Sequence, residues 1–121
     1  MVLVDTSVWV DYLRNGDSVL TDLLNRSLVC IHPMIIGELA CGNLQNRAEL
    51  MLLWQNLPHV TEASHDEVLL LLDNQQLMGK GIGYIDLHLL AATLLSKNTR
   101  LWTRDKRLSS ISEDLDVAFI P

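Results

Sequence analysis

The chain has 121 residues, of which 49% are hydrophobic and 20% are charged, and nine Lys and Arg against fifteen Asp and Glu give a net charge of −6. This composition is typical of one globular domain and excludes an intrinsically disordered chain. The acidic balance also argues against a protein that binds nucleic acid through bulk positive charge, because Lys and Arg make the phosphate contacts.

Two further properties of the chain bear on its location. No apolar stretch reaches the roughly 18 residues that a membrane span needs. The N-terminus has no basic region before its apolar run, so we expect neither a membrane anchor nor a signal peptide. Cys30 and Cys41 form no CxxC pair, which favours packed thiols in a reducing compartment. These features predict a cytoplasmic protein.

Strands and helices alternate in the predicted structure. In the first half we expect a buried strand, two helices, a second strand and two more helices, at residues 2–4, 7–13, 18–26, 28–31, 33–42 and 47–56. In the second half we expect a helix from residue 64, a glycine loop at 79–83, a helix at 84–96, a strand at 100–103, a short helix at 106–110 and a last strand at 117–120. Short connections between alternating elements predict an α/β fold, with helices on both faces of a mostly parallel sheet, in a single domain over residues 1–121.

Four acidic residues stand in segments whose neighbours are apolar. Asp5 and Asp105 follow predicted strands, while Glu38 and Asp86 lie near the beginning or middle of predicted helices. Because the carboxyl ends of parallel strands and the N-termini of the following helices meet at one edge of the sheet, we expect the four carboxylates to converge there. Each also has an ordinary explanation when taken singly: Asp86 and Asp105 can cap helices, and Glu38 can pair with an arginine.

Converging carboxylates repel one another unless cations lie between them. Their hard oxygen atoms select Mg²⁺ or Mn²⁺, and such a site suits hydrolysis of a phosphodiester bond, because the ions activate water and stabilise the developing charge. The hydroxyls of Thr6, Ser7 and Thr103 are candidates for orienting the carboxylates by hydrogen bonds. Helix capping by Thr6 or Ser7 is compatible with that role.

Each of the four acids lies in a longer characteristic stretch. These are DTSVWVDYLR from Asp5, IGELACG from Ile36, DLHLLAATL from Asp86 and LWTRDKRL from Leu101. In this order and spacing, across essentially the whole chain, they resemble the motifs of PIN-domain ribonucleases, and most closely those of the VapC toxins of type II toxin–antitoxin systems. One departure is Leu108, where relatives commonly carry Phe.

The resemblance implies a PIN-like three-layer α/β/α sandwich and an endoribonuclease that depends on Mg²⁺ or Mn²⁺. It also implies a homodimer and a cognate, VapB-like antitoxin that neutralises the toxin. On this basis Asp5, Glu38, Asp86 and Asp105 match the family's acidic quartet, as catalytic and metal-binding residues, with Asp5 and Asp86 as the principal ligands. His88 is less typical of the family, and we interpret it as a structural residue.

A cluster of basic residues surrounds the last of these acids. We predict that Arg104, Lys106 and Arg107 hold the RNA backbone next to the metal ions, although a solvated turn is the simpler interpretation of such a cluster. Val68–Leu72 of the helix after residue 64 is an uninterrupted apolar run, too wide for one buried face. Part of it is therefore expected to meet a second subunit or the antitoxin.

Two other function classes remain open at this stage. A phosphatase or phosphoacceptor domain also begins with an Asp, here Asp5, after its first strand. One such family needs a second Asp where this chain has Ser7, and the other needs an acidic pair before that strand's Asp and a late Lys, neither of which is present. A non-catalytic module that binds a partner through its leucine-rich helix is the second alternative, and the four intact acids argue against it.

Overall fold

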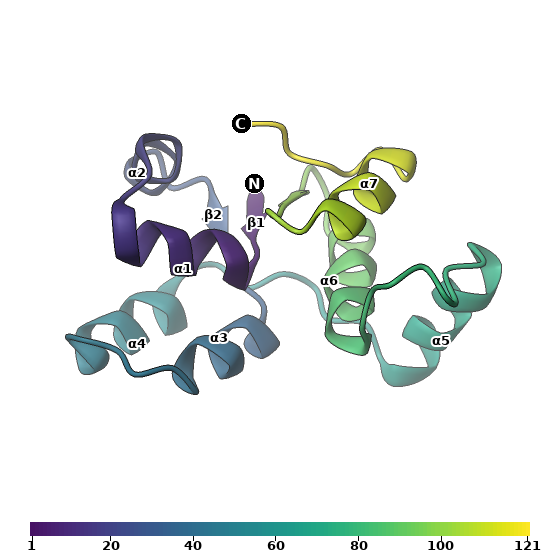
Figure 1. Ribbon diagram of the computed structural model, residues 1–121, viewed down its shortest axis with the longest axis horizontal. Coiled ribbons are helices and arrows are strands. Elements are labelled where there is room, and N and C mark those ends of the chain that lie inside the picture. The colour runs from purple at the N-terminus through teal and green to yellow at the C-terminus, as the bar shows by residue number, and fades with distance from the viewer.

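The computed structural model, which describes residues 1–121, contains three short strands and seven helices. The strands are β1 (Val2–Val4), β2 (Val29–Cys30) and β3 (Arg100–Trp102). The helices are α1 (Thr6–Asn15), α2 (Ser18–Asn25), α3 (Pro33–Ala40), α4 (Arg47–Asn56), α5 (His65–Asn74), α6 (Tyr84–Leu95) and α7 (Lys106–Asp114). Figure 1 shows the strands in the middle of the molecule, between a half formed by α1 to α4 and a half formed by α5 to α7.

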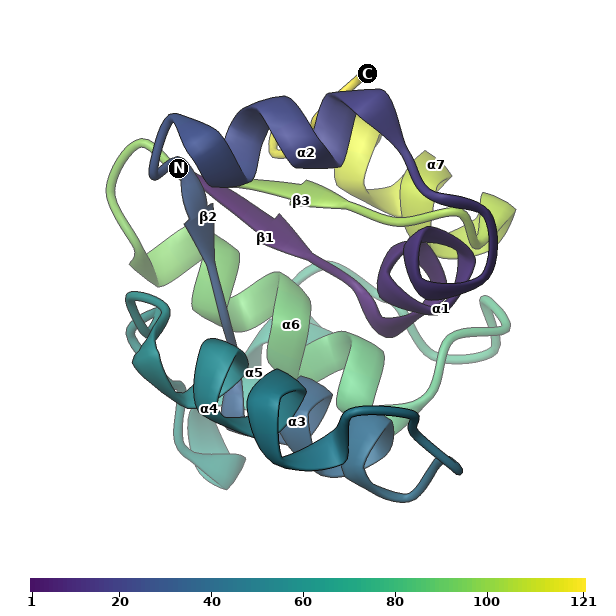
Figure 2. The same cartoon turned by 90° about the vertical axis from the view of Figure 1, so that its left-hand side faces the viewer.

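The sheet is parallel throughout, with the strand order β2-β1-β3. Two isolated parallel bridges, Ile31↔His59 and Leu101↔Ala118, extend it on both sides. Figure 2 views the sheet along its edge, with α2 and α7 on one side of the strands and α4 and α6 on the other. The predicted α/β fold, a parallel sheet between two layers of helices, is therefore confirmed.

The first strand lies at the centre because it is apolar on both faces. All three residues of β1 are buried, as expected of a middle strand in a parallel sheet covered by helices on both sides. The indole rings of Trp9 and Trp54 pack edge to face with their centroids 5.9 Å apart, and both residues are fully buried. This pair fixes α1 against α4 and so holds the end of β1 in place.

The C-terminal part of the chain differs from the prediction in two respects. Residues 117–120 form one bridge rather than a strand: Val117 accepts from Leu101 N–H and Phe119 donates to Leu101 C=O, and the chain ends soon afterwards. Helix α7 extends to Asp114, beyond the predicted residue 110, because Ile111 and Ser112 continue its buried face. No helix combines the length and apolar character that a bilayer crossing requires.

Candidate active site

Two of the four acids follow strands, and the other two lie within helices. Asp5 directly follows β1 and is the N-cap residue of α1, and Asp105 stands between β3 and α7 as the N-cap of that helix. Asp86 is the third residue of α6, and Glu38 lies in α3, which follows β2. Because all three strands are parallel, the helices that follow them begin on the same side of the molecule.

Asp5 is held by two hydroxyl groups from opposite ends of the chain. Its Oδ2 accepts hydrogen bonds of 2.8 Å from both Ser7 Oγ and Thr103 Oγ1, and only 8% of the residue is exposed. The two hydroxyls are themselves tied to backbone, since Arg104 N–H donates to Ser7 Oγ and Asp105 N–H donates to Thr103 Oγ1, each at 3.1 Å. This network joins the end of β1 to the end of β3.

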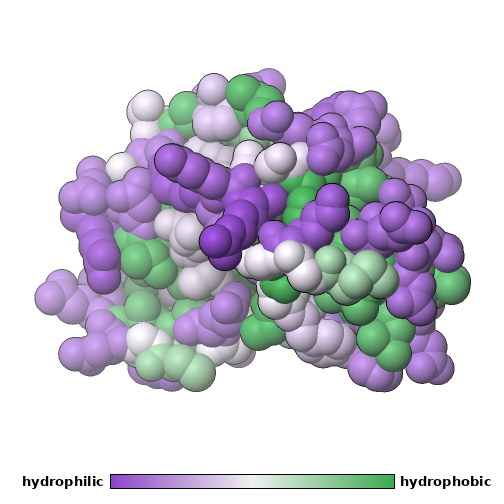
Figure 3. Space-filling model, turned by 45° about the vertical axis from the view of Figure 1, so that its right-hand side comes forward, coloured by the Kyte–Doolittle hydropathy of each residue, from purple (hydrophilic) through white to green (hydrophobic).

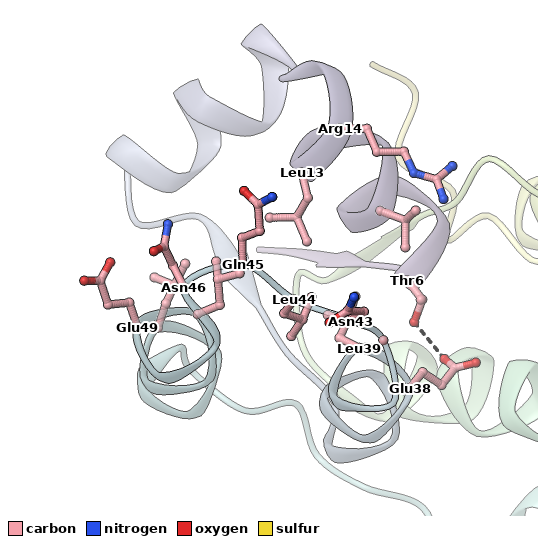
Figure 4. A pocket seen from close by; sticks show the side chains of 14 residues that line it. Thr6, Leu13, Arg14, Glu38, Leu39, Asn43, Leu44, Gln45, Asn46 and Glu49 are labelled. Carbon is pink, nitrogen blue, oxygen red and sulfur yellow. Dashed lines mark hydrogen bonds between the residues drawn. The ribbon is translucent and has the colours of Figure 1, made fainter.

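The other three carboxylates are each fixed through one oxygen. Glu38 Oε1 accepts from Thr6 Oγ1 at 2.7 Å, the contact drawn in Figure 4, and Asp86 Oδ2 accepts from Gly83 N–H at 3.2 Å. Asp105 Oδ1 caps α7 by accepting from the N–H groups of the second and third residues of that helix, at 2.9 and 3.0 Å. The capping roles expected for Asp86 and Asp105 are therefore present, and Thr6 serves Glu38 in addition to beginning α1.

In every one of the four acids, the second carboxylate oxygen accepts no hydrogen bond from the protein. These oxygens are Asp5 Oδ1, Glu38 Oε2, Asp86 Oδ1 and Asp105 Oδ2. The ion pairs of the protein involve other acids, namely Asp11, Asp17, Asp22 and Asp116. Each of the four acids is oriented through one oxygen, and its other oxygen has no cationic partner. The pairing of Glu38 with an arginine, considered from the sequence, is therefore absent.

The electrostatics of Asp86 report that the acids act on one another. Burial raises its pKa above the ordinary value, although the hydrogen bond from Gly83 N–H opposes this effect. The negative charges of Asp5, Asp105 and Glu38 raise the same pKa further. Four acidic groups that repel one another in this way favour the binding of a cation between them.

The three basic residues near Asp105 do not share one environment. The Arg104 guanidinium pairs with Asp11 Oδ2 at 3.0 Å and with Asp17 Oδ2 at 2.8 Å, and it lies 5.7 Å from the centroid of the Trp102 ring. The Arg104 side chain therefore connects the loop after β3 to α1 and to the start of α2. Lys106 and Arg107 are exposed and form no ion pair.

The Arg107 side chain packs against the glycine loop that precedes α6. A Cβ atom added to Gly81, whose φ is +82°, would lie 2.6 Å from Arg107 Cδ. We expect Gly81→Ala to lower the free energy of unfolding by more than about 1 kcal/mol, because the backbone is left-handed there and Arg107 must also move. Urea denaturation measures the loss. Gly79→Ala is the matched control, since Gly79 has φ +73° but open space around it; an equal loss in both variants would show that the contact with Arg107 contributes nothing.

Sequence reasoning missed a row of four packed rings, from the residue before α3, the first residue of α5 and two residues of α6. His32 caps α3 by accepting from Met34 N–H through Nδ1 at 3.0 Å, and its ring packs against that of His88 with centroids 6.1 Å apart. His88 in turn packs against Tyr84, and the Tyr84 hydroxyl lies 2.6 Å from His65 Nδ1. Only His32, which directly precedes a proline at the start of a helix, carried a recognisable sequence signal for its capping position.

The fold and the acidic edge can be compared with known proteins. Residues 2–114 match the family description of the PIN domain. The chain belongs to the PIN-domain family. It is also 42% identical, over 118 residues that cover 98% of this chain and 95% of the relative, to the protein named Ribonuclease VapC32 from Mycobacterium tuberculosis, in strain CDC 1551 / Oshkosh and in strain ATCC 25618 / H37Rv. The resemblance to VapC-type PIN domains inferred from the four motifs is therefore confirmed.

Proposed function

We propose that this PIN domain is the toxin component of a type II toxin–antitoxin system, an endoribonuclease that hydrolyses RNA phosphodiester bonds with the help of divalent metal ions in the cytoplasm. One observation carries the proposal. Asp5, Glu38, Asp86 and Asp105 each keep one oxygen free of protein hydrogen bonds, and no Lys or Arg neutralises them. Helix capping explains the bonded oxygens of Asp86 and Asp105, but those of Asp5 and Glu38 are held by side-chain hydroxyls.

The donor set fits Mg²⁺ or Mn²⁺. Both ions prefer carboxylate oxygens, and Mg²⁺ keeps several of its waters. No three of the chain's His, Cys, Asp and Glu side chains lie close enough together to hold an ion directly, so part of the acid set would act through such waters. When bound, the metal lowers the pKa of a water molecule and stabilises charge on the phosphate. Asp5 and Asp86 are the proposed principal ligands, with Glu38 and Asp105 completing the site.

The remaining site residues orient these acids and the substrate. Ser7 and Thr103 donate to Asp5, and Thr6 donates to Glu38, so each carboxylate group points in one direction before substrate arrives. Lys106 and Arg107 are proposed to contact RNA phosphates next to the acids, because their charges have no carboxylate partner. Arg104, predicted from the sequence as a third RNA contact, has its guanidinium engaged by Asp11 and Asp17, and we assign it mainly to positioning the loop that carries Asp105.

A groove beside Glu38 is the proposed binding surface for the antitoxin. It has a volume of about 740 Å³ and runs between α1, α3 and α4 from Thr6 and Glu38 toward Leu53. Figure 4 shows side chains from these elements lining it, with the hydrogen-bonded Thr6–Glu38 pair at one end. A segment of an antitoxin bound along this groove would reach Glu38 and obstruct the acids, which gives neutralisation a simple steric basis.

A second exposed surface is proposed as the homodimer contact. Leu69 and Leu70 of α5 and Leu94 and Leu95 of α6 are 39–59% exposed, and a small apolar hollow lies between the two helices. Figure 3, which turns this side of the molecule forward, shows hydrophobic side chains at the surface among hydrophilic ones. The pattern agrees with the apolar run noted in the sequence, and the molar mass in solution, measured by light scattering, tests it.

A single cleavage experiment tests the proposed activity. Purified protein is incubated with total RNA and Mg²⁺ or Mn²⁺, and newly formed 5′ ends are mapped by sequencing. We expect cleavage at a limited set of positions, which would also identify the substrate, and no cleavage in EDTA. Cleavage that persists in EDTA, or none with either metal, would contradict the proposal. A covalent phosphate trapped on Asp5 would instead favour the phosphoacceptor alternative.

Thr103 offers a milder test of how the site is organised. In Thr103→Val the side chain keeps its shape, but Asp5 Oδ2 loses one of its two donors and Asp105 N–H loses its acceptor. Loss of such orienting partners costs about tenfold or more in activity or metal affinity, so we expect kcat to fall about tenfold. Thr99→Val is the matched control, because the Thr99 hydroxyl bonds only to Lys97 C=O, before β3 begins. Equal kcat values for the two variants would argue against the orienting role.

A further inference from the structure

Tyr84 is the one exposed aromatic residue of the protein. The chain contains three Trp, two Tyr and one Phe. All three tryptophans are buried, and Tyr12 and Phe119 are partly buried in the core, whereas Tyr84 is 43% exposed. An aromatic ring left in water gains nothing from burial in the core, so its position and surroundings call for a specific explanation.

The Tyr84 ring is exposed but not free to move. Its hydroxyl is 2.6 Å from His65 Nδ1, and the two rings lie with centroids 5.6 Å apart. On another side it packs edge to face against His88 at 4.7 Å, and His88 is itself only 6% exposed. A ring fixed in this way has already lost its rotational freedom, which lowers the entropic cost of binding anything against it.

Tyr84 lies close in the chain to one of the four acids. Tyr84 is the first residue of α6, two positions before Asp86. A Cβ atom added to the neighbouring Gly83 would meet no atom of other parts of the chain within 4 Å, so the backbone at the start of α6 is not covered there. The apolar surface proposed for the dimer lies at the other end of α6, at Leu94 and Leu95, about 15 Å further along the helix axis. On α6, Tyr84 is therefore separated from the leucines of that surface.

We propose that Tyr84 is the platform on which one base of single-stranded RNA stacks while the neighbouring phosphate lies at the acids. This inference rests on the proposed ribonuclease function and deepens it. Phosphate contacts from Lys106 and Arg107 carry no sequence information, and a chain of net charge −6 gains little affinity from electrostatics overall. Stacking on an aromatic face does not depend on net charge, and it is the main way in which proteins recognise unpaired RNA bases. Tyr84 thereby contributes to substrate selection, and His65 and His88 position its ring.

The test distinguishes binding through the Tyr84 ring from binding through the charges of the surface. The protein carries Asp5→Asn, which prevents cleavage. It is titrated against fluorescein-labelled 12-nucleotide homopolymers of A, C and U, and against an abasic 12-mer with the same number of phosphates. Each titration is repeated at several salt concentrations. On that background, Tyr84→Leu removes the aromatic face and Tyr84→Phe keeps it. We expect Tyr84→Leu to bind the best homopolymer about tenfold more weakly, with unchanged binding of the abasic strand. The salt dependence should stay the same, because no charge is removed.

Cleavage kinetics and controls complete the experiment. In the otherwise unaltered protein, Tyr84→Leu should raise KM about tenfold and leave kcat within twofold. Tyr84→Phe keeps the aromatic face but loses the contact of the hydroxyl with His65, so its KM should lie between those of Tyr84→Leu and the parent chain. Leu52→Ala on α4, where Leu52 is 60% exposed, is the matched control for removing an exposed hydrophobic side chain, and thermal unfolding confirms that every variant is folded. If the parent chain cleaves RNA but Tyr84→Leu changes neither KM nor base preference, the stacking platform is disproved alone. If the parent chain cleaves no RNA, this inference and the proposed function fail together.

Discussion

Asp5→Asn is expected to lower the rate of RNA cleavage at least about 1,000-fold without unfolding the protein. Stabilisation of transition-state charge by a bound metal is worth several kcal/mol, and each 1.36 kcal/mol corresponds to a factor of ten in rate. Asn keeps an oxygen that can accept from Ser7 and Thr103, as Asp5 Oδ2 does, so the local structure should survive. Initial rates on the RNA identified by end mapping measure the effect.

The same substitution should change stability in the opposite direction. Asp5 is 8% exposed and has no cationic partner, and its charge raises the pKa of Asp86. Removing that charge relieves repulsion, so the metal-free Asp5→Asn protein should unfold at a higher temperature than the parent, and added Mg²⁺ should stabilise it less. Asp22→Asn serves as the control, since Asp22 forms only an exposed pair with Arg26. Full activity in Asp5→Asn would refute the assignment of Asp5 as a ligand.

The second large effect concerns the stability of the protein at acidic pH. His32 is 1% exposed, and burial lowers its pKa below the ordinary value of 6.5. Among the facing groups, the Glu62 carboxylate opposes this shift, and His88 and His59 add to it. The neutral ring is also required structurally, because Nδ1 accepts from Met34 N–H at the start of α3, and a protonated Nδ1 could only donate. Nε2 must then carry the hydrogen, and it has no partner.

The sign of the pH effect follows from linkage. A base whose pKa is lower in the folded state binds a proton more readily when the protein is unfolded. The contribution of His32 to the free energy of unfolding is therefore fully present above pH 6.5, and it is lost as the pH falls from 6.5 toward the folded pKa of His32. The slope should approach about 1.4 kcal/mol for each pH unit. Because α3 carries Glu38, activity should fall over the same range. Asp86, whose pKa is raised, acts in the opposite sense, stabilising the folded protein as the pH falls toward the range in which carboxylates titrate.

His32→Asn separates this effect from other titrations. Asn can cap α3 with its side-chain oxygen but does not titrate, so the slope of unfolding free energy between pH 7 and 5, measured by urea denaturation, should become smaller. The absolute stability at pH 8 should also fall, since Asn leaves part of the His32 volume empty. His65→Asn is the control, because His65 is exposed and is not among the groups that shift the His32 pKa. An unchanged slope in His32→Asn would show that other groups cause the acid sensitivity.

Local signals explain why so much of the fold could be predicted. The capping box at Ser64 and Glu67 and the proline at the start of α3 are visible in the sequence, and both are present in the structure. The end of α7 and the weak pairing of residues 117–120 were not predictable in the same way. A helix end and an edge pairing depend on which side chains the rest of the protein covers, here Ile111 and Ser112, and no local pattern specifies that.

The candidate site, like the fold, was only partly predictable from the sequence. Residue type and motif spacing identified the four acids and the three hydroxyls, because a carboxylate among apolar neighbours is conspicuous. The sequence could not distinguish Arg104 from Lys106 and Arg107, since only the folded chain brings Asp11 and Asp17 to the first of them. Nor could it indicate Tyr84, whose significance lies in being exposed when the other Trp, Tyr and Phe residues are buried or partly buried.

Strand and helix order and the parallel sheet were thus readable from the residue pattern alone, because periodicity and caps act over a few residues. The PIN-domain family was indicated by the resemblance of the four motifs to known proteins. The tertiary structure decided which oxygen of each acid is tied and which is free, which arginine is engaged by carboxylates, and which aromatic ring remains exposed. Each of these depends on groups far apart in the chain, such as Ser7 and Thr103 meeting at Asp5. Contacts of that kind form only when the core brings the strand ends together.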